Sequence, residues 1–251
     1  MTHILVIDVG NSRMKWAVRG PRGWTARGAV STQDIGTLAV RDWQTLERPA
    51  RAIGVNVAGE AARVRVEGQL ARWRLPVEWL TATAEAGGVT NGYETPSQLG
   101  PDRWVSLIAA RRRALAANES IPRACVVVNA GTAVTIDALD GDGTFRGGLI
   151  LPGIDLMLRS LADRTAGLRT PPGRFAPFPT RTPDALFSGA VQAACGAIEQ
   201  MRRQIRGHGP EVTCYLGGGD AQHVAPLLQG PVEVVDNLVL EGVLVLALAG
   251  R

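Results

Sequence analysis

Residues 4–15 have the sequence ILVIDVGNSRMK, and they set a pattern that the chain uses twice. An apolar run up to Asp8 is followed by Gly10 and Asn11, residues that tolerate a positive φ angle. The pattern predicts two strands, residues 4–8 and 14–18, joined by a tight polar turn. Backbone N–H groups in such a turn can converge on an anion, and Ser12 and Lys15 add a hydroxyl and a positive charge. The alternative is a plain hairpin whose turn is merely polar.

The second half of the chain repeats this plan. Strands are predicted at residues 125–128, 133–139 and 145–151, as they are at 4–8, 14–18 and 24–30, and each triplet leads into a predicted helix, at 33–46 and 154–164. Asn129-Ala130-Gly131-Thr132 takes the place of the first polar turn. We therefore expect an α/β fold made of two duplicated halves, whose turns face one cleft and could hold a triphosphate between them.

The remaining segments fill in the two halves. The first half, residues 1–118, would carry the first turn, and the second, residues 119–251, would carry the second turn and the glycine triplet Gly217-Gly218-Gly219. Loops are expected at residues 82–99 and 170–183. Further strands are predicted at 52–57, 77–80, 212–216 and 232–235, and further helices at 60–73, 103–117, 183–206 and 238–249.

Composition and charge exclude several classes of protein. The chain has 251 residues, of which 45% are hydrophobic and 20% charged, as in an ordinary globular protein. Its net charge is +4, but the basic residues are spread along the chain, which argues against nucleic acid as the main partner. All of them except Lys15 are arginine, so a compact ammonium group is expected to matter at that position.

Cysteine and histidine usage predicts a reducing, cytoplasmic environment without a zinc site. The three cysteines lack paired spacing and the three histidines form no metal-binding pattern. The start of the chain has no basic segment followed by a long apolar segment, and the longest apolar run, 238–249, is too short to cross a bilayer. The three cysteines are Cys125, Cys195 and Cys214, and the three histidines are His3, His208 and His223.

Asp102 and Arg103 stand side by side at the predicted start of a helix. The carboxylate can accept a proton from an alcohol, and the guanidinium fork can bind a carboxylate of the same small molecule. The alternative is that Asp102 only caps the helix and that Arg103 is a solvated residue of its first turn. The glycine triplet could let a flat ring or a phosphate approach the backbone, although a tight turn between strand and helix explains it equally well.

Together these motifs resemble those of type III pantothenate kinases. They occur in the family's order over nearly the whole chain: D-x-G-N-S-x-x-K at 8–15, Tyr93 followed by G-P-D-R-W at 100–104, G-T-A-V-T-I-D at 131–137, G-G-L-I-L-P-G at 147–153, and the glycine triplet. The resemblance implies the fold of the actin, sugar-kinase and chaperone-ATPase superfamily, with two ribonuclease-H-like halves. It also implies transfer of the ATP γ-phosphate to the primary hydroxyl of pantothenate, the first step towards coenzyme A.

The resemblance further implies a role for each matching residue. Asp102 would be the catalytic proton acceptor, and Asp8 would lie near the Mg²⁺ that accompanies ATP. The family's members are homodimers, in which the threonine before the long helix is offered to the neighbouring subunit. ATP would be bound by Asp8, Val9, Gly10, Asn11, Ser12, Arg13, Met14, Lys15 and Thr132, and pantothenate by Tyr93, Gly100, Pro101, Asp102, Arg103 and Thr182.

One position departs from the family's pattern. Asn129 stands where the family usually has an aspartate that helps to bind a monovalent cation. An amide oxygen can still ligate K⁺ or NH₄⁺, but it brings no charge, so the affinity for the cation should be lower.

Two other functions remain open at this point. A different small-molecule kinase of the same superfamily would share both polar turns but would have no reason to pair Tyr93 with residues 100–103. A non-catalytic transcriptional accessory protein of the same fold would tolerate the basic charge, yet no helix-turn-helix or concentrated basic face is evident.

Overall fold

A computed structural model describes residues 3–117, 123–164, 171–206 and 212–249. The chain forms two compact units, of which the first contains residues Met1–Arg113 and Leu238–Arg251 and the second Ala114–Asn237. The expected boundary between residues 118 and 119 lies outside the described residues, as does His208. Each unit is described by itself below.

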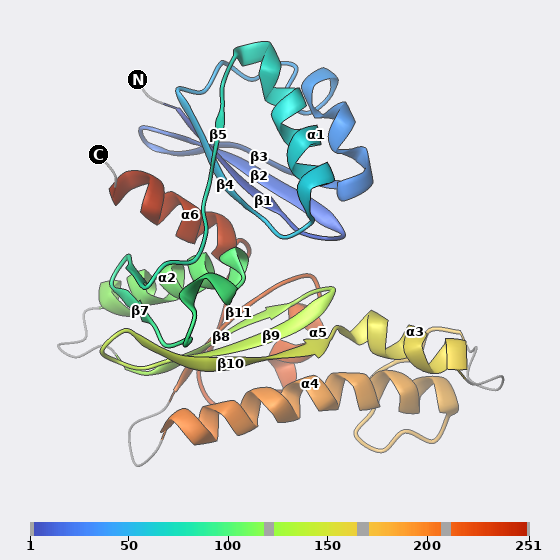
Figure 1. Ribbon diagram of the computed structural model, residues 1–251. Helices are drawn as coiled ribbons and strands as arrows, with labels where there is room; N and C mark the ends of the chain where they lie inside the picture. Colours follow the sequence, from blue (N-terminus) through green and yellow to red (C-terminus); the bar gives the residue numbers. More distant parts are fainter. Residues whose placement is uncertain (1–2, 118–122, 165–170, 207–211, 250–251) are drawn as a thin grey trace. The chain divides into compact units, whose positions relative to one another are not determined.

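The sheet of the first unit begins with the predicted strand pair. β1 and β2 are antiparallel, with Asp8 opposite Lys15, and β3 continues the antiparallel meander on the far side of β2. β4 lies parallel to β1 on its other side, and β5 is parallel to β4, which gives the order β3-β2-β1-β4-β5 (Figure 1). The bounds are β1 Ile4–Val9, β2 Arg13–Gly20, β3 Gly23–Ser31, β4 Arg51–Asn56 and β5 Val77–Trp79.

The second unit repeats this topology strand for strand. β8, β9 and β10 form an antiparallel meander, β11 is parallel to β8, and β12 is parallel to β11. The order β10-β9-β8-β11-β12 is therefore the same as in the first unit, which confirms the duplicated α/β fold. The bounds are β8 Cys125–Ala130, β9 Ala133–Leu139, β10 Thr144–Pro152, β11 Thr213–Gly217 and β12 Val232–Val234.

Helices cover both sheets. In the first unit α1 (Glu60–Leu70) and the 3-10 turn η2 (Ala71–Trp73) pack beside η1 (Thr32–Val40), and α2 (Pro101–Ala116) and α6 (Leu238–Ala249) complete the helical part. In the second unit α4 (Thr182–Arg206) runs along β8 and β9 (Figure 1). The shorter elements are β6 Glu85–Ala86, β7 Val89–Asn91, η3 Pro96–Gln98, α3 Ile154–Arg164, α5 Ala221–Val224 and η4 Ala225–Leu227.

The helix expected at residues 33–46 is instead the 3-10 helix η1 followed by turns. Gly36 and the β-branched residues in this segment disfavour a regular α-helix. Side chains of α1 and η2 replace part of the missing backbone hydrogen bonding: Gln69 Oε1 accepts from Ala39 N–H at 3.0 Å, and Arg72 Nη1 donates to the carbonyls of Ala39 at 2.6 Å and Trp43 at 3.3 Å.

The last helix, α6, packs in the first unit, whereas the sequence analysis grouped residues 119–251 together. It contacts β1, β4 and β2, and its Glu241 binds both Arg113 Nε and Nη2 of α2, at 2.8 and 2.7 Å. At Gly242 a Cβ atom would stand 1.8 Å from the carbonyl oxygen of Val105. The close approach of α6 to α2 therefore requires a glycine at this position.

We predict that Gly242→Ala strongly destabilises the first unit. The added methyl group has no space between α6 and α2, and forcing it in should cost about 1–3 kcal/mol of unfolding free energy. Gly68→Ala is the matched control, because Gly68 also lies in a helix and a Cβ there meets nothing within 4 Å. The control should be stabilised by roughly 0.5–1 kcal/mol. Chemical unfolding measures the unfolding free energy of both variants, and equal stabilities would contradict the close packing of α6 against α2.

Candidate functional site

The first polar turn is a short, exposed connection between β1 and β2. Gly10 N–H donates to the carbonyl of Arg13 at 3.0 Å, and the side chains of Asn11 and Ser12 face solvent. Thr32, at the start of η1, makes two further hydrogen bonds to the turn, from its hydroxyl to the Gly10 carbonyl at 2.7 Å and from its N–H to the Ser12 carbonyl at 3.1 Å. No motif in the sequence marks Thr32 as part of this turn.

Three charged side chains meet beside this turn, from β1, β2 and α2. The pKa of Asp8 is raised to about 7, mainly by burial and also by the negative charge of Asp102, while the positive charge of Lys15 opposes the shift. Asp8 keeps some accessible surface, but protein atoms surround it closely enough for desolvation to dominate. The fold thus brings together Asp8 and Lys15 of one motif with Asp102 of another.

A pair of neighbouring carboxylates with little solvent favours cations. Magnesium is a hard cation that prefers oxygen ligands and usually keeps several waters, with only one or two carboxylates and the phosphates of a substrate completing its shell. No group of three or more His, Cys, Asp or Glu side chains that could hold a metal is present among the described residues. The site fits a magnesium ion that arrives with phosphates and fits no metal held by side chains alone.

Asp102 occupies the first turn of α2. Burial raises the pKa of its carboxyl group, while the N–H and the charge of Arg103 lower it. Oδ1 accepts a hydrogen bond from the Arg103 N–H at 2.8 Å. Because α2 begins at Pro101, Asp102 lies inside the helix and is not the N-cap that the alternative interpretation of the sequence required. A Cβ at Gly100 would stand 2.8 Å from Oδ1 of Asp102, and a glycine therefore leaves room for this carboxylate.

Arg103 is buried and contacts Tyr93. Its Nη1 donates to the Tyr93 hydroxyl at 3.0 Å, and the guanidinium carbon lies 5.8 Å from the centre of the tyrosine ring. Arg103 is only 6% exposed, which rules out the alternative of a solvated residue. Asn91, which the sequence analysis missed, holds Tyr93 in place by accepting its N–H at 3.1 Å and donating to the carbonyls of Thr83 and Pro96.

The second polar turn is held by two glycines of its own unit. Gly131 N–H donates to the Ala133 carbonyl at 3.1 Å, and Gly153 N–H donates to the Thr132 carbonyl at 3.0 Å. A Cβ at Gly153 would stand 2.1 Å from the Gly131 oxygen, and a Cβ at Gly218, whose φ is +101°, would stand 2.1 Å from the Ala130 oxygen.

The glycine triplet lies directly beside this second turn. Gly217 is opposite Asn129 in the parallel pairing of β11 with β8, and Asp220 N–H donates to the Ala130 carbonyl at 3.0 Å. Gly218, the middle residue of the triplet, allows β11 and the turn to approach each other, a packing role that spacing alone did not distinguish from ligand binding.

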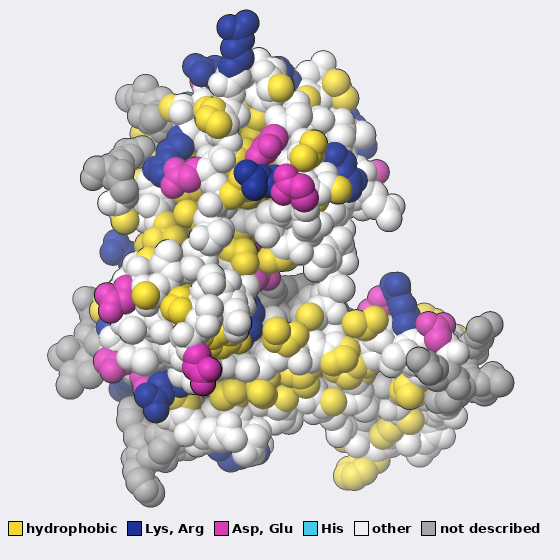
Figure 2. All heavy atoms as spheres, viewed as in Figure 1, with side chains coloured by type: hydrophobic (Ala, Val, Ile, Leu, Met, Phe, Trp, Pro, Cys, Tyr) yellow, Lys and Arg dark blue, Asp and Glu magenta, His cyan; other side chains and the backbone are white. Residues whose placement is uncertain are grey.

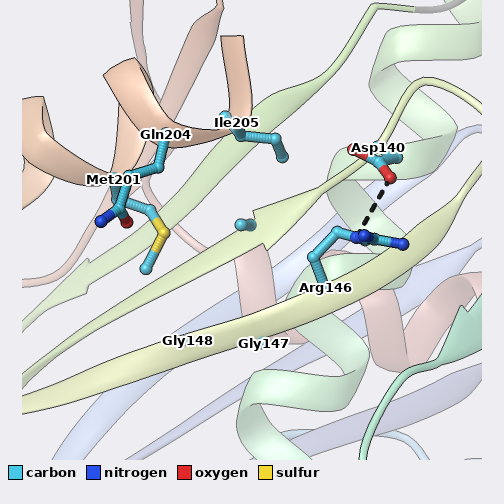
Figure 3. Close-up of a pocket in the computed structure, with 8 residues that line it drawn as sticks. Asp140, Arg146, Gly147, Gly148, Met201, Gln204 and Ile205 are labelled. Carbon is cyan, nitrogen blue, oxygen red and sulfur yellow. Dashed lines mark ion pairs between the residues drawn. The ribbon is translucent and has the colours of Figure 1, made fainter. Parts of the chain in front are cut away.

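Thr182 is the first residue of α4 and lines an apolar cavity of about 350 Å³ between α3 and α4. A different pocket of about 460 Å³ lies between β9, β10 and the end of α4, where Arg146 pairs with Asp140 at 3.5 Å (Figure 3). None of the predicted site residues lines this second pocket, so we do not assign it to the candidate site.

The cysteines are structural, as the sequence analysis preferred for Cys125 and Cys195. All three are buried free thiols, and burial raises the pKa of Cys195 to about 11 and that of Cys214 to about 12. The reactive thiolate is therefore scarce at neutral pH. In the parts of the chain that the structure describes, no helix is long and apolar enough to cross a membrane.

Comparison with known proteins assigns a family to this arrangement. Residues 4–204 match the family model for type III pantothenate kinase. A type III pantothenate kinase from Leptothrix cholodnii is 46% identical over 97% of this chain and 95% of its own, and one from Acidovorax ebreus is 44% identical with the same coverage.

Solved structures agree on the fold at much lower identity. A protein from Campylobacter jejuni assigned to the Baf family of transcriptional activators has a TM-score of 0.65 at 20% identity, with 98% of each chain covered. A protein from Listeria monocytogenes, thought to be an N-acetylmannosamine kinase, has a TM-score of 0.55 at 13% identity over the whole of both chains. These likenesses establish the actin, sugar-kinase and chaperone-ATPase fold, and at such identities they bear on nothing else.

We predict that Asp8→Asn stabilises the protein most at high pH. The native state binds a proton at Asp8 up to about pH 7, whereas the unfolded chain releases it near pH 4, so wild-type stability falls as the pH rises between these values. The asparagine variant escapes this loss and should gain roughly 2 kcal/mol at pH 8, a figure reduced for the solvent that still reaches Asp8.

Melting temperatures between pH 5 and 8, without magnesium, test this difference. Asp42→Asn, which neutralises an exposed carboxylate in the same unit, is the control. A stability difference between Asp8→Asn and wild type that is the same at pH 5 and pH 8 would contradict the desolvation of Asp8.

Proposed function

The chain belongs to the type III pantothenate kinase family, and on this premise we propose that it transfers the γ-phosphate of ATP to the primary hydroxyl of pantothenate, the first step of coenzyme A biosynthesis. One observation carries the assignment to these residues: Asp102, a half-buried carboxylate, directly precedes Arg103 of the Arg103–Tyr93 pair, and its charge acts on Asp8, which Lys15 also influences. A proton acceptor, an anion-binding group and a phosphate-binding turn are thereby assembled in one unit.

ATP is bound by the first turn, residues 8–15, together with Thr132 of the second turn. Lys15 neutralises phosphate charge, and Asn11 and Ser12 offer polar groups from the exposed turn. Asp8 orders the Mg²⁺ that accompanies ATP, directly or through water, and the ion supplies positive charge to the phosphates when it is bound.

Asp102 aligns the primary hydroxyl of pantothenate and accepts its proton. Phosphoryl transfer needs little covalent assistance, so positioning the nucleophile and balancing charge account for most of the acceleration. A carboxyl group whose pKa is raised by burial is a stronger base once ionised, which suits this role.

Arg103 binds the carboxylate of pantothenate, with Tyr93, Gly100 and Pro101 completing this part of the site. Its buried guanidinium attracts an anion more strongly than an exposed one would, because little water screens the interaction. The hydrogen bond from Arg103 to the tyrosine hydroxyl fixes the orientation of both side chains before the substrate arrives.

A monovalent cation, K⁺ or NH₄⁺, completes the proposed cofactors, with Asn129 as one ligand through its amide oxygen. Because Asn129 carries no charge, the cation should bind weakly and higher concentrations should be needed. We place the reaction in the cytoplasm, where the three free cysteines would stay reduced.

The variants Asp102→Asn and Arg103→Lys test the assignment in a coupled assay of ADP release, run with and without pantothenate in potassium, ammonium and sodium salts. Asp102→Asn should lower kcat by about 100-fold or more, with little change in the KM for ATP, because the lost group acts on the alcohol. Arg103→Lys should mainly raise the KM for pantothenate, because lysine lacks the two-pronged contact. Near-normal turnover of Asp102→Asn would show that another group accepts the proton.

We also propose that the protein acts as a homodimer built on the α3 and β10 face of the second unit. Hydrophobic side chains gather over this face (Figure 2), where Leu149, Ile150, Leu156 and Leu161 are 41–66% exposed. Thr182 borders the same face, which fits its proposed contribution to the neighbouring subunit's pantothenate site.

Ile150→Glu should therefore give a monomer with impaired pantothenate turnover. The introduced charge cannot be buried between two copies without a large desolvation cost. Val234→Glu is the matched control, since Val234 is 59% exposed on β12, away from the proposed interface. Light scattering after gel filtration measures the mass, and a dimeric Ile150→Glu variant would contradict this choice of interface.

A further inference from the structure

We propose that Thr32 positions the nucleotide-binding turn and thereby sets the affinity for Mg-ATP. The proposal rests on the function proposed above for residues 8–15 and assigns a role to a residue outside that motif. Thr32 is 8% exposed and lies directly after β3, twenty-two residues beyond Gly10 in the sequence.

The two hydrogen bonds of Thr32 constrain the turn at both of its ends. The hydroxyl holds the carbonyl of Gly10 at 2.7 Å, and the N–H holds the carbonyl of Ser12 at 3.1 Å. In a trans peptide the C=O and the following N–H point in opposite directions. Because Thr32 holds the Gly10 carbonyl, the N–H of Asn11 points away from Thr32. A turn that offers its N–H groups to phosphate requires this orientation.

The second unit shows which part of this contact is general and which is special to Thr32. Gly153 follows β10 as Thr32 follows β3, and its N–H donates to Thr132 as the N–H of Thr32 donates to Ser12, at 3.0 and 3.1 Å. The backbone contact is thus common to both halves. The hydroxyl contact exists only in the first half, because glycine has no side chain.

Thr32 is itself held by the helices that pack on η1. Arg65 Nη1 of α1 donates to the Thr32 carbonyl at 3.3 Å, and Arg72 and Gln69 bind the far end of η1. α1 and η2 therefore hold η1, the element that carries the Thr32 hydroxyl, in place. A side chain so fixed can hold the Gly10–Asn11 peptide in one orientation in the absence of the nucleotide, which reduces the ordering that binding requires.

The test compares Thr32→Val, which removes the hydroxyl and keeps the shape, with Thr32→Ser, which keeps the hydroxyl. Thr25→Val is the matched control, because the Thr25 hydroxyl also bonds a backbone carbonyl of β2, that of Val18 at 3.2 Å, away from the turn. Calorimetric titration with Mg-ATP gives the Kd, steady-state kinetics give KM and kcat, and thermal unfolding reports stability.

Thr32→Val should weaken Mg-ATP binding about fivefold, the change expected for the loss of one hydrogen bond. The KM for ATP should rise with it, the KM for pantothenate should stay unchanged, and Thr32→Ser should restore the wild-type Kd. Thr25→Val should lose a similar amount of stability without a change in Kd. If Thr32→Val does not fold, Thr32→Ala replaces it and the same comparison applies.

The proposal is overturned if a folded Thr32→Val or Thr32→Ala variant binds Mg-ATP within twofold of wild type, or if Thr32→Ser is as impaired as Thr32→Val. A wild-type protein that binds Mg-ATP but does not phosphorylate pantothenate would refute the proposed substrate alone, and the Kd comparison would still decide the role of Thr32. Failure of the wild type to bind Mg-ATP would overturn both.

Discussion

Burial, together with the neighbouring charge of Asp102, makes a charged Asp8 unfavourable, and this constraint governs the chemistry of the first unit. Two carboxylates from β1 and α2 lie close enough for the charge of one to raise the pKa of the other, in a place where burial already disfavours both charges. The single lysine of the chain, Lys15, relieves part of this repulsion from the neighbouring strand. The remaining negative charge favours cations at this position, which supports our proposal that the Mg²⁺ accompanying ATP lies here.

The strands and the duplicated topology could be predicted from the sequence because they depend on local signals. Apolar runs broken by glycine and asparagine define β1, β2, β8 and β9, and each chain half folds by the same rule. The segment after β3 could not be predicted this way. Its 3-10 form depends on bonds from Gln69 and Arg72, which lie some thirty residues further along the chain.

The candidate site was predictable only in part, for the same reason. The neighbouring residues Asp102 and Arg103 suggested acid–base and anion-binding roles by themselves, but a place for Tyr93 in the same site followed only from family resemblance, and its bond to Arg103 only from the structure. Thr32, Asn91 and Gly153 act through backbone groups of other segments, and no local pattern marks such a role. Gly153 belongs to the motif at residues 147–153, but only its contact with Gly131 shows that a Cβ atom would have no space at this position.

The arginines explain why a basic chain need not bind nucleic acid. Several of them direct their guanidinium groups to backbone carbonyls of their own unit: Arg48 to Trp73, Arg51 to Ala247, Arg72 to Ala39 and Arg202 to Val212. A planar fork with five donors can satisfy carbonyls in loops that lack regular partners, which an ammonium group does less well. These four arginines thus direct their charge to carbonyl groups of the fold, and the family to which the chain belongs favours the kinase over the transcriptional accessory function.

The two halves have diverged in chemistry while keeping their geometry. Asp8 and Asn129 stand at equivalent places, each one residue before the end of the first strand and two before the glycine of its turn. Thr32 and Gly153 make the same backbone contact, but only Thr32 adds a hydroxyl. The first half thus concentrates the charged and hydroxyl groups. The second half keeps a neutral turn, held by Gly153 and Gly218, that can follow a phosphate chain without adding a further negative charge to repel it.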